Sequence, residues 1–177
     1  RLPDGAPLRV VDLGTGSGAI ALAIASARRH AQVIATDASS DALDIARDNA
    51  ARLDLANVAF AHGSWYDALA AHAAPFDAIV ANPPYVADGD PHLAQGDLPH
   101  EPAAALASGA EGLDALRVVV AGAPPRLSDG GWLGVEHGHD QSDAVRDLFA
   151  GAGFEAIEVR RDLAGIPRVV LGRKPSR

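Results

Sequence analysis

A glycine-rich segment near the start of the chain has the composition of a cofactor-binding loop. Asp12-Leu13-Gly14-Thr15-Gly16-Ser17-Gly18 follows a short apolar run and precedes a helical pattern. Glycine lets a ligand approach the backbone closely, and the N-terminus of the following helix offers free N–H groups and a positive dipole end. Asp37 ends the next apolar run, where its carboxylate can accept hydrogen bonds from both hydroxyls of a ribose. These residues predict a site for a nucleoside-containing cofactor.

The loop by itself leaves two cofactor classes open. Gly14, Gly16 and Ala19 also fit the pattern G-x-G-x-x-G/A, which is typical of nicotinamide and flavin enzymes. Asp12 favours S-adenosyl-L-methionine, because a carboxylate there suits a sulfonium and an amino group better than a pyrophosphate. We therefore expect S-adenosyl-L-methionine, with S-adenosyl-L-homocysteine as the product, bound by Asp12, Gly14, Thr15, Gly16, Ser17, Gly18, Asp37 and Asn82.

The tetrapeptide Asn82-Pro83-Pro84-Tyr85 follows the fourth apolar run and has the residues to hold a planar amino group. The Asn82 side-chain oxygen and the Pro83 carbonyl are two acceptors for the two hydrogens of an –NH₂ group. Pro83 and Pro84 stiffen the backbone, and the Tyr85 ring offers a face for a flat group. This predicts methylation of an amide or exocyclic amine by orientation and electrostatics, with Asn82, Pro83 and Tyr85 catalytic and all four residues binding the substrate.

Short β-branched runs alternate with helical patterns, which indicates a parallel sheet covered by helices. We expect an α/β fold with a doubly wound, mostly parallel seven-stranded sheet and an antiparallel C-terminal strand. The predicted strands are 8–13, 32–36, 57–61, 76–81, 131–136, 154–160 and 168–172, and the last two form a hairpin that turns at Gly165 and Pro167. The predicted helices are 19–29, one that starts at Ser39 or Ser40, 112–127 and 141–152.

Several side chains are assigned from these patterns. The second helix places Leu43, Ala46, Ala50 and Leu53 on one face, and Trp132, Phe149 and Phe154 are core candidates. Residues 86–102 read as a functional loop without periodicity. Glu136 ends a strand near the site, where a structural role and a supporting role are equally open. The histidines match no standard ligand spacing, so no metal is expected at His62, His72, His92, His100, His137 or His139.

The composition narrows the class of protein. The 177 residues are 48% hydrophobic and 21% charged, which fits one globular domain. The lack of cysteine excludes disulfides, thiolate nucleophiles and cysteine-ligated metals. A net charge of −8 argues against nucleic acid as the direct substrate. No apolar stretch suits a membrane span and no signal peptide is evident, so we expect no membrane partner and a cytoplasmic protein.

Taken together, these motifs resemble those of class I S-adenosylmethionine-dependent methyltransferases, and within that class the HemK/PrmC-type peptide chain release factor glutamine N5-methyltransferases. The similarity extends beyond the glycine loop and the tetrapeptide to Asp90-Pro91-His92-Leu93, Gly96-Asp97, Glu101-Pro102, Glu136-His137-Gly138, Asp162-Leu163-Ala164-Gly165 and Arg168-Val169. The resemblance implies methylation of the glutamine in the Gly-Gly-Gln motif of bacterial-type release factors. It also implies that Trp65 and Ser64 belong to the cofactor site. Trp65 would pack by the adenine, and Ser64 stands where relatives often have aspartate as an adenine partner.

The resemblance carries an expectation about domains as well. Residues 1–177 correspond to the catalytic domain, and the small helical N-terminal domain of the family is not recognisable in this sequence, which contains no methionine. Other functions stay open at this point. The same tetrapeptide chemistry serves N5-glutamine methylation of a ribosomal protein and adenine N6-methylation of nucleic acid. A nicotinamide oxidoreductase would have no use for the tetrapeptide, and a non-catalytic binding module would not need the complete set of motifs.

Overall fold

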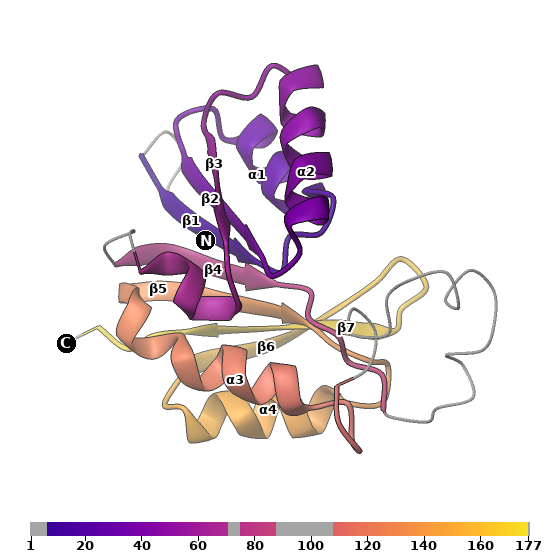
Figure 1. Ribbon diagram of the computed structural model, residues 1–177. Helices are drawn as coiled ribbons and strands as arrows, with labels where there is room; N and C mark the ends of the chain where they lie inside the picture. The colour runs from indigo at the N-terminus through magenta and orange to yellow at the C-terminus, as the bar shows by residue number, and fades with distance from the viewer. Residues whose placement is uncertain (1–6, 71–74, 88–107, 177) are drawn as a thin grey trace.

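The computed structural model describes residues 7–70, 75–87 and 108–176, which form one seven-stranded sheet with helices on both faces (Figure 1). The strand order is β3-β2-β1-β4-β5-β7-β6. All neighbours from β3 to β5 run parallel, and β7 is antiparallel to both β5 and β6. The strands are β1 (Arg9–Leu13), β2 (Gln32–Asp37), β3 (Val58–His62), β4 (Phe76–Ala81), β5 (Leu127–Glu136), β6 (Glu155–Arg161) and β7 (Pro167–Arg173). The expected fold class is confirmed.

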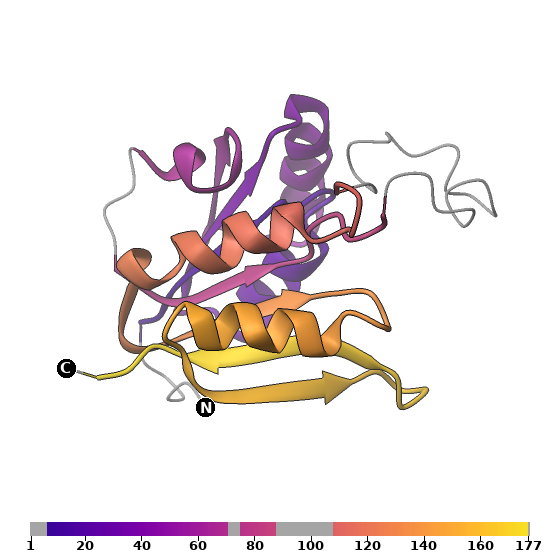
Figure 2. The ribbon, with the colours of Figure 1, turned by 90° about the horizontal axis from the view of Figure 1, so that it is seen from below.

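Helices cover the two faces of the sheet because alternate strand residues point to opposite sides. Val10 belongs to an apolar cluster with α1, whereas its neighbour Val11 belongs to a larger cluster with α3 and α4. Figure 1 shows α1 and α2 beside β1 to β3, and Figure 2 shows α3 and α4 together on the other face. The helices are α1 (Ala19–Ala27), α2 (Ser40–Arg52), α3 (Asp114–Gly122) and α4 (Ser142–Gly151).

The strand order brings the two sequence motifs together. β1 lies between β2 and β4 and runs parallel to both, so the chain winds outward in opposite directions from this point. The glycine loop leaves the carboxyl end of β1, and the Asn82-Pro83-Pro84-Tyr85 tetrapeptide leaves the carboxyl end of β4. In sheets of this kind the crevice between two such loops is the place where ligands bind.

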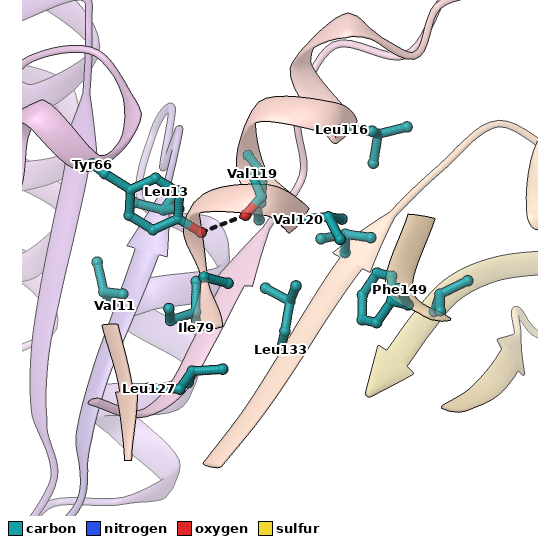
Figure 3. Packing of buried hydrophobic residues seen from close by; sticks show 14 of the residues in the cluster. Val11, Leu13, Tyr66, Ile79, Leu116, Val119, Val120, Leu127, Leu133 and Phe149 are labelled. Carbon is teal, nitrogen blue, oxygen red and sulfur yellow. Dashed lines mark hydrogen bonds between the residues drawn. The ribbon is translucent and has the colours of Figure 1, made fainter. Parts of the chain in front are cut away.

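A short 3₁₀ helix, η1 (Trp65–Leu69), follows β3 and contacts α3. The buried Tyr66 hydroxyl donates to the Val119 carbonyl, with 2.6 Å between the oxygens (Figure 3). Burial raises the pKa of the Tyr66 hydroxyl, so it stays protonated and available as a donor. Gly122 on α3 packs against the same ring, where any larger side chain would overlap it. Trp65, the first residue of η1, is thereby tied to the core.

The second half of the chain departs from the predicted boundaries. The helix expected over 112–127 ends at Gly122, and a 3₁₀ turn, η5 (Pro124–Arg126), leads into β5, which starts four residues earlier than predicted. Two consecutive prolines lack backbone donors and stop the α-helix there. Pro167, expected in the hairpin turn, is the first residue of β7. The hairpin itself is confirmed, and Asp162 caps its turn by accepting from the backbone amides of Ala164 and Ile166.

The core predictions are mostly confirmed. Phe149 and Phe154 are buried with their ring centroids 5.1 Å apart, and Leu43, Ala46 and Ala50 are buried on α2. Ser39 is the N-cap of α2 and accepts from the Ala42 amide. The prediction that Leu53 shares this helix face was wrong, because α2 ends at Arg52 and Leu53 is 55% exposed. Trp132 is half-buried on β5 rather than enclosed in the core, and most of the loop expected over 86–102 falls outside the described residues.

Candidate active site

A cleft of about 520 Å³ lies at the carboxyl ends of β1, β2 and β4, where the sequence motifs predict a cofactor. It draws on both motifs: the glycine loop forms one wall, and the end of β4 contributes to another. Its lining residues are Gly14, Thr15, Gly16, Ser17, Ala19, Ile20, Asp37, Ala38, Gly63, Ser64, Trp65, Asn82 and Pro84. Eight of the ten residues expected to bind the cofactor line this cleft, and Asp12 and Gly18 do not.

The glycine loop keeps its wall of the cleft open. Gly14 and Gly16 have φ angles of +71° and +57°, a conformation that side chains with a Cβ rarely adopt. At Gly14, an added Cβ would lie 3.4 Å from the Trp65 ring, so a side chain there would be in van der Waals contact with the indole. At Gly16, nothing lies within 4 Å of the Cβ position. The backbone there faces open space, as a loop that cradles a ligand requires.

Asp12 supports the loop from below. Its side chain is 1% exposed, and its Oδ2 atom accepts from the Thr15 hydroxyl at 2.7 Å and from the Ala21 amide at 3.1 Å. Ala21 lies in the first turn of α1, where a carboxylate also benefits from the helix dipole. Burial nevertheless raises the pKa of Asp12 to about 6. Asp12, which the sequence predicted to bind the cofactor, therefore lies beneath the glycine loop and fixes the shape of that loop.

Asp37 does reach the cleft. Its Oδ2 atom accepts from the Gly16 amide at 2.8 Å, and its Oδ1 atom accepts from the Ser39 amide at 2.9 Å. The carboxylate therefore connects the glycine loop to the start of α2 across the end of β2. Each carboxylate oxygen has a second lone pair, so both remain able to accept a hydrogen bond from a ligand. A pair of vicinal hydroxyls fits this arrangement.

Trp65 and Ser64 follow β3 on the far side of the cleft. Trp65 has a φ angle of +43°, which is uncommon for a residue with a bulky side chain. Such conformations persist where the surrounding structure holds them, and they concentrate at functional sites. Here the Ser64 carbonyl accepts from the Asp67 amide to close the first turn of η1, and Trp65 packs against the core. The half-buried indole presents a flat surface to the cleft beside Gly14.

The tetrapeptide lies between this cleft and a second pocket. Asn82 and Pro84 line the cofactor cleft, and Pro83 is buried. Tyr85 lines the second pocket, whose other residues are Glu136, Arg161, Asp162, Arg168 and Val169. The tetrapeptide therefore borders both cavities, with Asn82 and Pro84 on one side and Tyr85 on the other.

Glu136 is the partner of Tyr85. The Tyr85 hydroxyl donates to Glu136 Oε1 across 3.4 Å, and half-burial is the main reason that the pKa of Tyr85 is raised. The negative charge of Glu136 adds to this rise, and the positive charge of Arg168 opposes it. Tyr85 is therefore a neutral donor at physiological pH. Glu136, whose role the sequence left open, supports the tetrapeptide.

The remaining sequence predictions concern metal binding and residues of the loops around the site. Among the residues that the structure describes, no cluster of acidic or histidine side chains could hold a metal ion. His72, His92 and His100 lie outside those residues, as do Asp90 to Leu93, Gly96, Asp97, Glu101 and Pro102.

The sequence did not point to Gly63, Ala38 and Ile20, which also line the cleft. Their positions directly after β3, after Asp37 and in the first turn of α1 were the available signal.

The family model for the methyltransferase small domain matches residues 1–122 of the chain. The chain belongs to the methyltransferase small domain family. Among curated proteins, it is 56% identical over 175 residues to a release factor glutamine methyltransferase from Xylella fastidiosa and 51% identical over 173 residues to one from Neisseria gonorrhoeae. The alignments cover 99% and 98% of this chain, but 63% and 62% of those proteins.

A solved structure supports the same assignment of fold and family. The chain superposes on the release-factor-specific protein-(glutamine-N5) methyltransferase from Alicyclobacillus acidocaldarius with a TM-score of 0.55 and 31% sequence identity. That superposition covers 99% of this chain and 83% of the other. The chain thus has the class I methyltransferase fold. Within the described part of the chain, no helix is long and apolar enough to cross a bilayer.

Proposed function

We propose that this chain is the catalytic domain of an enzyme that methylates the side-chain amide N5 of the glutamine in the Gly-Gly-Gln motif of peptide chain release factors. The observation that carries this proposal is that Asn82 and Pro84 line the same cleft as the glycine loop and Asp37. An acceptor for an amide –NH₂ group thus stands directly beside a nucleoside-sized site. The names of the relatives that match 98–99% of this chain point to the same substrate.

The residues of the cleft fit S-adenosyl-L-methionine. The backbone of Gly16 is open toward the cleft, Asp37 can accept from the two ribose hydroxyls, and Trp65 offers a flat apolar face for the adenine ring. Ser64 lies beside Trp65 in the lining of the cleft. When bound, this cofactor supplies an electrophilic methyl group on a sulfonium that is already a good leaving group.

The chain itself has to bind and orient the acceptor. The lone pair of an amide nitrogen is delocalised into the carbonyl, which makes the nitrogen a poor nucleophile. Acceptors at Asn82 Oδ1 and the Pro83 carbonyl would hold both amide hydrogens and turn the lone pair toward the cleft. The Tyr85 ring, steadied by Glu136, would lie against the flat amide group. Orientation of this kind is a large part of catalysis when no covalent intermediate is needed.

The charge of the chain favours a protein substrate over a nucleic acid. The net charge is −8, and phosphate binding requires clustered cations. Arg161 and Arg168 lie near Tyr85 but share their pocket with Glu136 and Asp162, and Arg168 pairs with Asp162 at 3.4 Å. A balanced pocket of this kind suits a polypeptide loop that carries polar groups of both kinds.

The proposal is tested by transfer of isotope-labelled methyl from S-adenosyl-L-methionine to a purified bacterial release factor. The matched control is the same release factor with the glutamine of its Gly-Gly-Gln motif changed to alanine. We expect label on the first protein and none on the second. Because the curated relatives are longer, the assay is run on this chain and on the full-length protein that contains it. Label on both release factors, or on neither with the longer protein, would overturn the proposal.

A further inference from the structure

The Gln141 side chain connects three segments that meet behind the tetrapeptide. Its Nε2 atom donates to the Tyr85 carbonyl at 2.9 Å and to the Glu111 carbonyl at 3.1 Å, and lies 3.4 Å from the Gly112 carbonyl. Its Oε1 atom accepts from the Gly138 amide at 2.8 Å. One amide group therefore joins the end of the tetrapeptide, the segment before α3 and the turn after β5.

The contacts of the Gln141 side chain are not those of a residue that caps a helix. It occupies the N-cap position of α4, but its side chain makes no hydrogen bond to the free amides of that helix. Serine, threonine, aspartate and asparagine are the residues that stabilise a helix from this position. The orientation of the Gln141 side chain is therefore explained by the groups that it contacts outside α4. One of these groups is the carbonyl of Tyr85, which belongs to the tetrapeptide that we propose binds the substrate.

The backbone around Tyr85 is held at further points from the same side. The Val86 carbonyl accepts from the Ser108 amide at 2.9 Å, and the Ser108 hydroxyl accepts from the Ala115 amide at the start of α3. Gly112 lies so close to the Tyr85 carbonyl that an added side chain would overlap it. The Val86 carbonyl is thus bonded to the segment that leads into α3, and the neighbouring Tyr85 carbonyl lies against that segment and is bonded to Gln141.

We propose that Gln141 is a positioning residue for methyl transfer: it holds the Tyr85 carbonyl and so fixes where the tetrapeptide presents the acceptor amide. The inference rests on the proposed function, because it gives the tetrapeptide the role of holding that amide. Gln141 does not line the cofactor cleft. Its loss should therefore lower kcat and leave cofactor binding unchanged.

The first variant is Gln141→Ser, because serine is too short to reach Tyr85 but is a favoured helix N-cap. We expect kcat to fall by about 10- to 100-fold, because a small misplacement of a bound substrate lowers the rate of an enzyme by this order. The dissociation constant of S-adenosyl-L-methionine, measured by calorimetry, should change by less than about twofold. The control Ala144→Ser adds the same side chain at an exposed position in the first turn of α4 and should keep wild-type kcat.

A second variant and a second readout guard against misfolding and against failure of the proposed function. Gln141→Glu keeps the shape and the acceptor for Gly138 but replaces the donor with a carboxylate that faces backbone carbonyls. In both variants, NMR should show at least about tenfold faster hydrogen exchange of the Ser108 amide, whose protection depends on a fixed Val86 carbonyl. In Gln141→Ser the Gly138 amide should exchange faster as well.

The outcomes separate the two proposals. If the wild-type protein does not methylate the release factor, the proposed function fails, but the exchange rates still show whether Gln141 holds the loop. Wild-type exchange at Ser108 in both variants would overturn the inference whatever the activity. Unchanged kcat in Gln141→Ser, or a fall in kcat that follows only from weaker cofactor binding, would overturn it too.

Discussion

The Asp37 carboxylate accepts a hydrogen bond from the Gly16 amide, with 2.8 Å between Oδ2 and the nitrogen. Asp37 ends β2, and Gly16 belongs to the loop that follows β1. Their hydrogen bond fixes the glycine loop relative to the carboxylate that we propose binds the ribose. The loop wall and the ribose acceptor are therefore positioned together. A change at Asp37 should affect the cofactor both directly and through the loop.

Asp37→Asn should weaken S-adenosyl-L-methionine binding by about 10- to 100-fold, because hydrogen bonds to a charged group are stronger than those to a neutral one. Isothermal calorimetry measures the effect, and quenching of Trp65 fluorescence offers an independent signal beside the glycine loop. The control Asp44→Asn removes an exposed carboxylate that pairs with Arg47 on α2, and it should bind the cofactor normally. Equal affinity in the two variants would argue against the ribose role.

Gly14→Ala should destabilise the fold by about 1 to 2 kcal/mol, because the residue has a left-handed backbone conformation that disfavours a Cβ. The new methyl group would lie in ordinary van der Waals contact with the Trp65 ring, so the backbone conformation is the cause of the loss. The matched control is Gly151→Ala at the end of α4, where the Cβ position is open and the backbone is helical. That variant should gain about 0.5 to 1 kcal/mol. Urea unfolding of both variants checks the prediction, and stabilisation by Gly14→Ala would contradict it.

Asp12 should make the fold less stable as the pH rises. Its pKa is raised from 3.8 to about 6 in the folded protein, so between those values the folded state binds more protons than the unfolded state. The contribution of Asp12 is therefore fully present below pH 4 and is lost as the pH rises to about 6. From pH 4.5 to 7.5 the loss is about 2 kcal/mol.

Asp12→Asn removes this titration and keeps an oxygen for Thr15 and Ala21. The difference in unfolding free energy between the wild-type protein and this variant isolates Asp12 from all other titrating groups. Urea unfolding at the two pH values should show the wild-type protein losing stability relative to the variant. Parallel pH dependence of the two proteins would mean that the Asp12 carboxyl is not perturbed in this way.

Tyr85 should contribute through its ring more than through its hydroxyl. Tyr85→Phe removes only a long hydrogen bond to Glu136, so we expect methyl transfer to slow by about two- to tenfold. Tyr85→Ala removes the flat surface that positions the amide and should slow transfer by about 100-fold. Steady-state kinetics with the release factor measures both effects. A Phe variant as slow as the Ala variant would assign the main role to the hydroxyl instead.

The sequence predicted the parts of the molecule in which local chemistry determines position. Asp37 ends β2 and Asn82 directly follows β4, and parallel strands that neighbour β1 must bring their carboxyl ends to one edge. The pattern could not show that Asp12 lies beneath the loop, because both orientations of the carboxylate are compatible with the same spacing. It also placed Leu53 on a helix face, although α2 ends one residue earlier.

Tertiary contacts explain what the sequence did not reveal. Gln141 lies 56 residues from Tyr85 along the chain, and no motif links the two before the fold brings them within 2.9 Å. Trp132 fits an alternating strand pattern, yet its burial depends on what covers its face of the sheet. Tyr66 likewise had no sequence signal for its bond to Val119, which joins η1 to α3.

The most direct test of the account is mass-spectrometric mapping of the methyl group on a release factor treated with this protein and S-adenosyl-L-methionine. We predict one added methyl on the glutamine side chain of the Gly-Gly-Gln peptide. Asn82→Ala should abolish it while the variant still folds, because the amide then loses one of its two acceptors. A methyl group on another residue, or unchanged methylation by Asn82→Ala, would contradict the account.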